Sequence, residues 1–592
     1  MTDSSNRFET ARRLAWPYFR RYRGAYALGL LFLIGTNAAQ VAVPWLLKQG
    51  VDLISALDQD PDVVARLGYV ALWIALAAVA QAITRVASRW HIFRTGRDVE
   101  YEVRQRAYDH VLALDPAWYA RHSRGDVISR VTNDIGNIRL LFGFGVLQLA
   151  NTIAAYAAAL TMMLSMSWKL TALALAPFPL LFWVLRNFGG RLHARFMGAQ
   201  QSLGELSGFL QQALQGMDVV RGFGQQQGFL ERFERVNEHN YQANMRLAWT
   251  RSLMAPLMIF VSGFGIFVVL AAGGWFVIHK EITIGEFVAF QGYLGMLVWP
   301  TLALGWLFNV LERGLASLGR VDELLSAEPV IRDRATAREI DLKGRLRVQI
   351  DGLTLQAEDG GTFELSHVAF EAAPGERVAV VGRTGSGKTV LLQTLLRLFD
   401  TPPGAVFLDD VDICDLKLET LRTRIGYLPQ EPFLFGRTIR DAVTIGTNAY
   451  DDAQIEDALR RADIIDDVRA LPEGLDTRLG ERGVTLSGGQ RQRLMIARLL
   501  MTSPAVALLD SPLASMDFAT ADRVRGELQA FACDRTVLWA THRLETMEWF
   551  DRILLLEEGR LIAMGPHEAL MDQPLYRSLY ERQQLMRALE QT

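Results

Sequence analysis

The stretch Gly382–Thr389, GRTGSGKT, decides the fold of the carboxyl-terminal half of this chain. It matches the phosphate-binding loop pattern G-x-x-x-x-G-K-[S/T] at every position. An apolar, β-branched run, residues 378–381, precedes it, and a run typical of a helix, residues 390–399, follows it. The motif requires this context, because its glycines let backbone N–H groups face a phosphate at the positive end of a helix. The sequence therefore predicts a nucleotide-binding α/β domain.

Each position of this loop has an expected role in holding ATP and Mg²⁺. Lys388 is expected to reach the β- and γ-phosphates, and Thr389 to offer its hydroxyl to Mg²⁺. The other loop residues are expected to surround the phosphates: Gly382, Arg383, Thr384, Gly385, Ser386 and Gly387. Farther along, Asp510 ends the apolar run AVALLD, and there it would hold Mg²⁺ through water.

The composition separates the chain into two halves. Hydrophobic residues make up 50% of the 592 residues, and long apolar runs fill residues 25–310. The net charge is −3 and no basic stripe offsets the acidic residues, which argues against nucleic acid as the main partner. The cysteines, Cys414 and Cys533, both lie in the soluble half and indicate a reducing compartment. The basic N-terminal segment is followed by a very long apolar run, so we do not expect a cleavable signal peptide.

Apolar segments of membrane-spanning length fill the first half, since a spanning helix needs about 20 residues. We place six apolar cores at Tyr26–Leu47, Leu67–Ile83, Val146–Met166, Leu170–Leu185, Pro256–Ile278 and Phe287–Leu307. Arginines crowd the two long connections, and acids occupy the connection after the first segment. By the distribution of basic residues, the long connections and both termini are cytosolic. Residues 8–24 are amphipathic and basic, which predicts a helix lying on the inner membrane surface.

The two long connections keep a helical pattern beyond the membrane. Residues 85–114 would extend about 45 Å as a helix. Each connection then turns, first near Asp115–Asp126 and again near Gly216–Gln225. We expect a short helix at each turn, placed to contact a soluble domain.

Several motifs in one order resemble the ATP-binding cassette of ABC transporters. They are the phosphate loop, Gln430 after an apolar segment, LSGGQ at Leu486–Gln490, the acid Asp510, and His542 at the end of TVLWATH. With six preceding spans, the chain resembles a half-size (type IV) ABC exporter. In the membrane half this resemblance includes SRGDVISRVTND (123–134) and ITIGEFVAFQGYL (282–294). The sequence as a whole, including MLVWPTLALGWLFNVLERG (296–314), is similar to bacterial multidrug-resistance-like half-exporters that work as heterodimers.

The resemblance implies an α-helical polytopic membrane domain fused to an α/β P-loop cassette. It divides the chain into an interfacial elbow helix (1–24), a transmembrane domain with two cytosolic coupling turns (25–325), a linker (326–347) and the cassette (348–592). In the family two cassettes stack head to tail. The signature residues Ser487, Gly488, Gly489 and Gln490 would then contact the nucleotide bound mainly by the partner. Gln430 is expected at the metal and the attacking water, and His542 at the γ-phosphate.

The sequence departs from the family pattern at two positions. The residue after the strand acid is normally a glutamate that polarises the attacking water, and here it is Ser511. A serine hydroxyl is uncharged at neutral pH, so we expect this chain's own site to bind ATP with little hydrolysis. The aromatic residue that usually stacks on adenine falls at Ala357, and whether Phe363 substitutes for it is left open.

These features predict ATP-driven export of amphipathic, multidrug-like small molecules across the cytoplasmic (inner) membrane. The intact LSGGQ predicts a heterodimer with a second half-exporter subunit that carries the glutamate. A homodimer with two weak sites and an engineered serine are the alternatives. A lipid flippase is a close variant of the function, and a nucleotide-gated channel or regulatory subunit is the alternative from another class. The expected partners are the second subunit, membrane lipid and the transported molecule.

Overall fold

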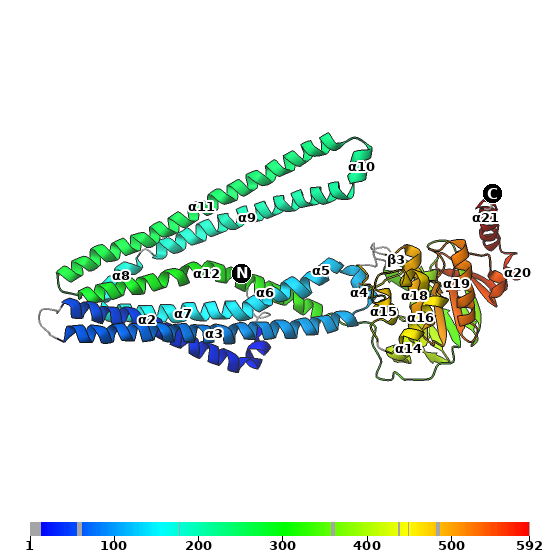
Figure 1. Cartoon of the computed structure of the whole chain (residues 1–592), viewed down its shortest axis with the longest axis horizontal. Coiled ribbons are helices and arrows are strands. Elements are labelled where there is room, and N and C mark those ends of the chain that lie inside the picture. Colours follow the sequence, from blue (N-terminus) through cyan, green and yellow to red (C-terminus); the bar gives the residue numbers. More distant parts are fainter. Residues whose placement is uncertain are drawn as a thin grey trace. The chain divides into compact units, whose positions relative to one another are not determined.

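The structure is a computed structural model that describes residues 14–55, 62–176, 178–356, 362–435, 438–447, 449–480 and 486–590. The chain forms two compact units. The first comprises Met1–His110 and Ile128–Ser326, and the second comprises Val111–Val127 and Ala327–Thr592. Figure 1 shows that the first unit is made of long helices and that the strands belong to the second. The expected position of the adenine-stacking aromatic, residue 357, lies outside the described residues.

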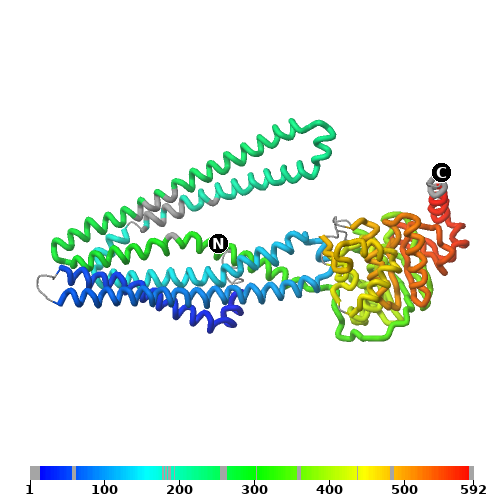
Figure 2. Tube along the Cα trace, in the orientation of Figure 1, coloured from blue at the N-terminus to red at the C-terminus, as the bar shows by residue number. Residues whose placement is uncertain are grey.

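Helices that lie wholly or partly in the first unit coincide with the six segments that the sequence predicts as membrane spans, and the fourth segment, Leu170–Leu185, is divided between α8 and α9. They are α2 (Arg23–Ser55), α3 (Val63–Ala113), α5 (Arg124–Ser129), α6 (Ile135–Leu140), α7 (Val146–Met166), α8 (Trp168–Leu175), α9 (Phe178–Gln215), α10 (Met217–Gly222), α11 (Gln226–Ile278) and α12 (Ile284–Leu325). Two π-helical turns, η1 (Arg130–Asp134) and η2 (Leu141–Gly145), join α5, α6 and α7 into one stretch. In Figure 2, α9 and α11 run side by side and α10 connects them at one end. This short helix lies at the second turn expected from the sequence.

Four stretches of the described chain are long and apolar enough to cross a membrane. They are Arg23–Ser55, Val63–Ala113, Arg124–Met166 and Ile284–Leu325, and Gly263–Ile278 is a shorter apolar helix. Only 22%, 6%, 39% and 35% of their most apolar windows are buried within the chain. Apolar side chains that are not buried in the chain need another apolar environment, which lipid or a second subunit provides.

Close helix approaches inside the first unit occur at small residues. A Cβ atom on Gly292 of α12 would lie 3.1 Å from Pro44 of α2, and one on Gly273 of α11 would lie 2.7 Å from the ring of Phe287. Small residues at such contacts let helix backbones approach, which is the usual packing device between membrane helices. Around them, Phe290, Tyr293, Leu297 and neighbours form a buried apolar cluster with residues of α7, α8 and α11.

A six-stranded sheet forms the centre of the second unit, in the order β12-β11-β5-β10-β9-β8. Its strands are β5 (Arg377–Gly382), β8 (Ile425–Leu428), β9 (Val506–Asp510), β10 (Thr536–Ala540), β11 (Arg552–Glu557) and β12 (Arg560–Gly565). All neighbours pair in parallel except the edge strand β12. A four-stranded antiparallel sheet is formed by β4 (Val368–Ala372), β1 (Leu346–Ile350), β6 (Val406–Leu408) and β7 (Val411–Asp412), and β2 (Leu353–Gln356) pairs with β3 (Thr362–Leu365).

The central sheet has a separate apolar core on each face. Side chains of a strand alternate between faces, and in β5 Ala379 and Val381 enter one core while Val378 and Val380 enter the other. Because both faces are buried, the parallel strands read as continuous apolar runs in the sequence. The helices of this unit are α4 (Pro116–Arg121), α13 (Lys388–Leu395), α14 (Leu418–Arg424), α15 (Ile439–Thr444), α16 (Asp452–Arg461), α17 (Ile465–Arg469), α18 (Gly488–Leu500), α19 (Phe518–Phe531), α20 (His567–Leu570) and α21 (Pro574–Glu590).

The short helix α4 lies at the first turn that the sequence predicts. The Asp115 carboxylate caps its start, accepting from the Trp118 amide at 2.9 Å. The same carboxylate accepts from the amide of Val330 at 3.2 Å. One side chain thus both starts the helix and ties it to the chain segment that follows α12.

Candidate functional site

The phosphate loop connects β5 to α13 in a shape that only glycine permits at its tightest points. Gly387 has φ 98°, in the left-handed region, which favours glycine. A Cβ there would lie 2.7 Å from the ring of Phe363, and one on Gly382 would lie 2.2 Å from the carbonyl of Leu556. The loop backbone is therefore held between β3 and the end of β11.

Lys388 is a buried cation at the start of α13. Its Nζ donates to the carbonyl oxygens of Gly382 at 3.0 Å and Arg383 at 2.9 Å. Burial lowers its pKa to about 8, against a smaller opposing effect of Asp510. A buried charge that is incompletely compensated favours a bound anion, and the lysine is placed to meet a phosphate at the helix start.

Three further candidate residues lie at the same edge of the central sheet. Because β8, β9 and β10 run parallel next to β5, their carboxyl ends meet where the phosphate loop begins. Asp510 is the last residue of β9, while Gln430 and His542 follow β8 and β10 by two residues. The structure thus places the three motifs at the same edge of the sheet as the loop: β10 is the neighbour of β5, β9 is the next strand and β8 the third.

Asp510 has the environment of a ligand for a cation. Burial raises its pKa, while a hydrogen bond from Thr389 and the charge of Lys388 act in the opposite direction. Its Oδ2 atom is buried and accepts no hydrogen bond from the described residues. Buried carboxylate oxygens need a partner, so this donor set fits Mg²⁺ beside a triphosphate. Burial and the Lys388 charge lower the pKa of His542, which favours its neutral imidazole.

Ser511 occupies a constrained, buried position directly after Asp510. Its φ of 48° is left-handed, which is uncommon for a residue with a side chain. Its amide donates to the Ala540 carbonyl at 2.9 Å, and its carbonyl accepts from Gln492 Nε2 at 3.4 Å. Within the described chain, the Ser511 hydroxyl and Gln492 Oε1 are buried without hydrogen-bond partners. Hydrogen bonds thus fix the Ser511 backbone, whereas its hydroxyl makes no hydrogen bond to the described residues.

The LSGGQ segment begins α18, which packs in the apolar core that contains Ala379 and Val381 of β5. Ser487 Oγ accepts from the Gln490 amide at 3.2 Å, and Gln490 Oε1 accepts from the Ser487 amide at 2.9 Å. This reciprocal pair is a capping box. A Cβ on Gly489 would lie 2.9 Å from the Ser515 carbonyl, so glycine keeps the first turn close to the loop after β9. The glycines Gly488 and Gly489 leave helix-start N–H groups uncovered by their own side chains.

Two contacts of the phosphate loop are not evident from the motif. Phe363 of β3 lies against Gly387, and the amide of Gly559, between β11 and β12, donates to the Ser386 carbonyl at 3.1 Å. Gly559 has a positive φ of 77°, which is typical of the turn that a glycine in the pattern EEGRL predicts. The sequence raises Phe363 only as a possible adenine contact, and it gives no sign of the contact that Gly559 makes with the loop.

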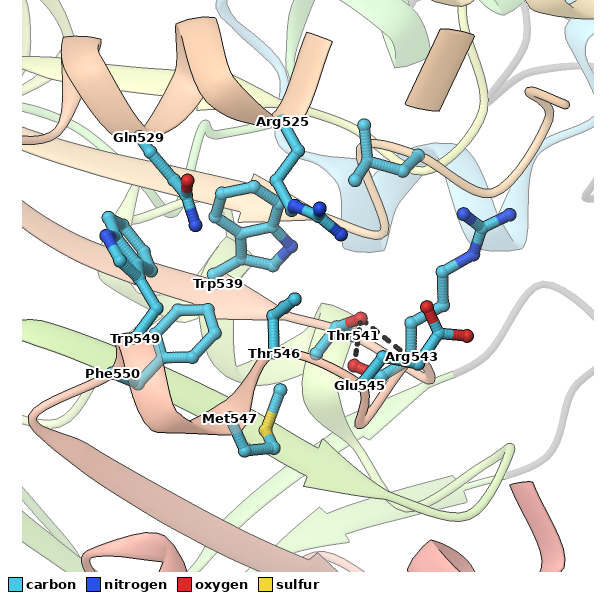
Figure 3. Close-up of a pocket in the computed structure, with 11 residues that line it drawn as sticks. Arg525, Gln529, Trp539, Thr541, Arg543, Glu545, Thr546, Met547, Trp549 and Phe550 are labelled. Carbon is cyan, nitrogen blue, oxygen red and sulfur yellow. Dashed lines mark hydrogen bonds between the residues drawn. The ribbon is translucent and has the colours of Figure 1, made fainter. Parts of the chain in front are cut away.

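A pocket lies beside the loop that carries His542 (Figure 3). It is lined by Leu513, Arg525, Gln529, Trp539, Thr541, Arg543, Glu545, Thr546, Met547, Trp549 and Phe550. Its lining includes no phosphate-loop residue. The Arg543 amide donates to Thr541 Oγ1 at 2.9 Å, and the Leu544 amide donates to Gln583 of α21 at 2.7 Å. These bonds hold the backbone directly after His542.

Comparison with known proteins decides the family. Residues 26–301 match the ABC transporter transmembrane region, and residues 365–514 match the ABC transporter family. The chain is 33% identical over 587 residues to the "Probable multidrug resistance ABC transporter ATP-binding/permease protein YheI" of Bacillus subtilis, with 98% of this chain and 99% of the relative covered. The chain belongs to the ABC transporter family. Its two matched regions, fused in one chain, make it a half-size ABC exporter and a multi-pass membrane protein.

Other ABC transporter relatives match over nearly the whole chain. The "Multidrug resistance-like ATP-binding protein MdlA" of Escherichia coli is 32% identical, with 98% of this chain and 97% of the relative covered. The "ATP-dependent lipid A-core flippase" of Coxiella burnetii is 29% identical, with 97% and 95% covered. A bacterial Atm1-family ABC exporter, solved with ATP bound, has the same fold with a TM-score of 0.76 at 24% identity, covering 95% of this chain and 98% of that one. The predicted fold class is confirmed.

Proposed function

We propose that this chain is the hydrolysis-poor half of an ATP-driven exporter of amphipathic small molecules. It works in the cytoplasmic (inner) membrane with both termini in the cytosol. The observation that carries the proposal is Ser511, which stands directly after Asp510 with its hydroxyl buried and unbonded among the described residues. The backbone that should present a general base therefore presents a short, uncharged group.

The phosphate loop supports ATP binding by this chain. The loop N–H groups and Lys388 would hold the phosphates, while Thr389, Gln430 and Asp510 would hold Mg²⁺. The bound ion would neutralise charge on the phosphates. His542 would donate a hydrogen bond to the γ-phosphate. The Ser511 hydroxyl cannot act as a base toward water, so ATP would stay bound at this site for long periods.

The signature segment supports a second, different subunit. Its capping box holds the start of α18 ready, with Gly488 and Gly489 leaving helix-start N–H groups available to a phosphate. Such a segment would be without use if no site hydrolysed ATP. A partner chain with the glutamate would supply the working site, completed by Ser487, Gly488, Gly489 and Gln490 of this chain.

The transported molecule is proposed from the relatives. Two relatives carry multidrug resistance in their names, which favours amphipathic small molecules. The name of a third, a lipid A-core flippase, keeps a lipid substrate as the second candidate. Transport of a labelled lipid rather than a dye in reconstituted vesicles would favour the second.

ATP turnover by the purified chain, alone and co-expressed with a candidate partner subunit, tests the proposal. We expect turnover only in the pair, and its loss when the partner's glutamate is replaced by glutamine. In the chain alone, Ser511→Glu should create turnover, whereas the matched control Ser511→Ala should remain silent. Brisk turnover by the unaltered chain alone would refute the slow site.

A further inference from the structure

The chain passes between its two units in three places, and each lies in or directly after a helix. The crossings follow His110 in α3, Val127 in α5 and Ser326 at the end of α12. These three connections are covalent routes by which a movement that ATP causes in the second unit can reach the first. The stiffness of their attachment to one another therefore matters for a transporter.

The connection through α5 is bonded to α12 by a buried carboxylate. Asp134, the last residue of η1, has a side chain that is 4% exposed. It accepts from Ser317 Oγ at 2.8 Å and from Arg320 Nε at 2.8 Å, and Arg320 Nη2 bonds its other oxygen. A paired guanidinium and carboxylate define both distance and orientation. The two helices are thereby held together near the ends at which they leave the first unit.

A second set of contacts strengthens this attachment. Asn137 of α6 donates to Ser317 Oγ at 3.1 Å. Arg130, at the start of η1, donates to the Arg320 carbonyl at 3.2 Å and to Glu323 at 3.0 Å. These bonds lie on both sides of the Asp134 pair along α12.

The short helix α6 also forms an ion pair with α3 on another side, without a hydrogen bond from Arg139 Nε to any residue that the structure describes. Arg139 of α6 lies 3.4 Å from Glu100, whose side chain is 10% exposed and also pairs with Arg97 and Arg104. A Cβ on Gly96 would lie 3.0 Å from the Arg139 carbonyl and from backbone atoms of η2. The backbones of α3 and the α6 region are therefore in direct contact.

We propose that α6 clamps the three connections into one body, so that a cassette movement reaches α3, α5 and α12 together. The α6 network consists of Glu100, Asp134, Arg139, Ser317 and Arg320. All five belong to the first unit, whereas the phosphate loop belongs to the second, so we assign them a positioning role. The π turns η1 and η2 flank α6, and single π turns inside helices often mark functional positions. The proposal rests on ATP-driven export by this chain.

Asp134→Asn and Arg320→Gln remove the charges of the pair while keeping side chains of similar size. Arg320→Lys keeps the positive charge and is the conservative variant. Glu102→Gln is the matched control, because Glu102 lies on α3 two residues from Glu100 and pairs with Arg21 outside the network. All variants are made in the full chain together with its partner subunit.

Spin labels are attached at Val64→Cys, near the start of α3, and at Ile278→Cys, at the end of α11. Both positions are exposed, and the distance between the labels reports movement of the spans. The native cysteines lie in the second unit and are replaced by serine. ATP with Mg²⁺ is the probe, and ATP affinity and thermal unfolding are measured on the same samples. We expect the ATP-dependent distance change to be lost in Asp134→Asn and Arg320→Gln with ATP affinity unchanged, and kept in Arg320→Lys and Glu102→Gln.

The outcomes separate this inference from the proposed function. A distance change that persists in both Asp134→Asn and Arg320→Gln would overturn the clamp while leaving ATP-driven movement intact. Loss of the change in Glu102→Gln as well would also overturn it, since any charge removal would then suffice. An unaltered complex that binds ATP without any distance change would refute the proposed function itself, and the clamp would fall with it.

Discussion

Nucleotide affinity should fall as the pH rises through the pKa of Lys388. Burial disfavours the ammonium form and lowers this pKa to about 8. The protonated lysine attracts the phosphates, and the neutral amine does not. A lysine with a lowered pKa loses its charge as pH rises, so binding is strong below about pH 8 and weakens above it.

The size of the effect follows from the fraction of lysine that is charged. With a pKa of about 8, about nine-tenths is protonated at pH 7 and about one-tenth at pH 9. If only the charged form binds, the dissociation constant rises about tenfold over this range, or about 1.4 kcal/mol. Other shifted groups nearby do not titrate in this window, since the pKa of His542 is lowered and that of Tyr427 is raised to about 12.

Equilibrium binding of a fluorescent ATP analogue between pH 7 and 9 measures the effect, in a range above the last phosphate ionisation near pH 6. Lys388→Arg is the control, because arginine stays charged throughout. Its affinity should be flat with pH, whatever its absolute value. An unaltered chain with pH-independent affinity, or an equal slope in Lys388→Arg, would refute the assignment of the effect to this buried lysine.

Further variants probe backbone and capping contacts. Gly387→Ala should lower the unfolding midpoint, costing about 1–3 kcal/mol, because its Cβ would meet the ring of Phe363 at 2.7 Å. Gly385→Ala, also at positive φ but with open space around it, is its control, and an equal loss in both would show that the ring is irrelevant. Thr536→Val should cost about 1–3 kcal/mol, since its buried hydroxyl donates to the Gly344 carbonyl at 2.7 Å, and an unchanged midpoint would contradict this. Asp115→Ala should cost about 1 kcal/mol of helix stability, seen as faster hydrogen exchange in α4, and unchanged exchange would count against the cap.

The places of the nucleotide-site motifs in the fold could be predicted because each motif follows a local rule. Each motif lies at the end of an apolar strand, and parallel strands bring their carboxyl ends to one edge. Gln430, Asp510 and His542 therefore lie at the same sheet edge as the phosphate loop although many residues separate them in sequence. The apolar helices of the first unit were predicted for a similar reason, since hydropathy over a window needs no knowledge of tertiary contacts.

Contacts between distant segments could not be predicted from the sequence. Asp134 and Arg320 are 186 residues apart and lie in ordinary helical patterns, so nothing local marks them as a pair. Phe363 likewise reads as a strand residue, and only the folded hairpin places it on Gly387. The roles of Ser511 and of the LSGGQ residues stay predictions, because they depend on the chemistry of a bound nucleotide and on a second subunit.

The two π turns also affect how this protein can change in length during evolution. A π turn holds one residue more than the α turn that it replaces. Deletion of one residue inside Arg130–Asp134 could therefore be absorbed by conversion to a regular α turn, leaving the faces of the flanking helices in place. The same deletion inside α6 would rotate all following residues by about 100°, since an α-helix has about 3.6 residues per turn. We expect gaps between distant homologues to fall within the π turns and to be absent from α6.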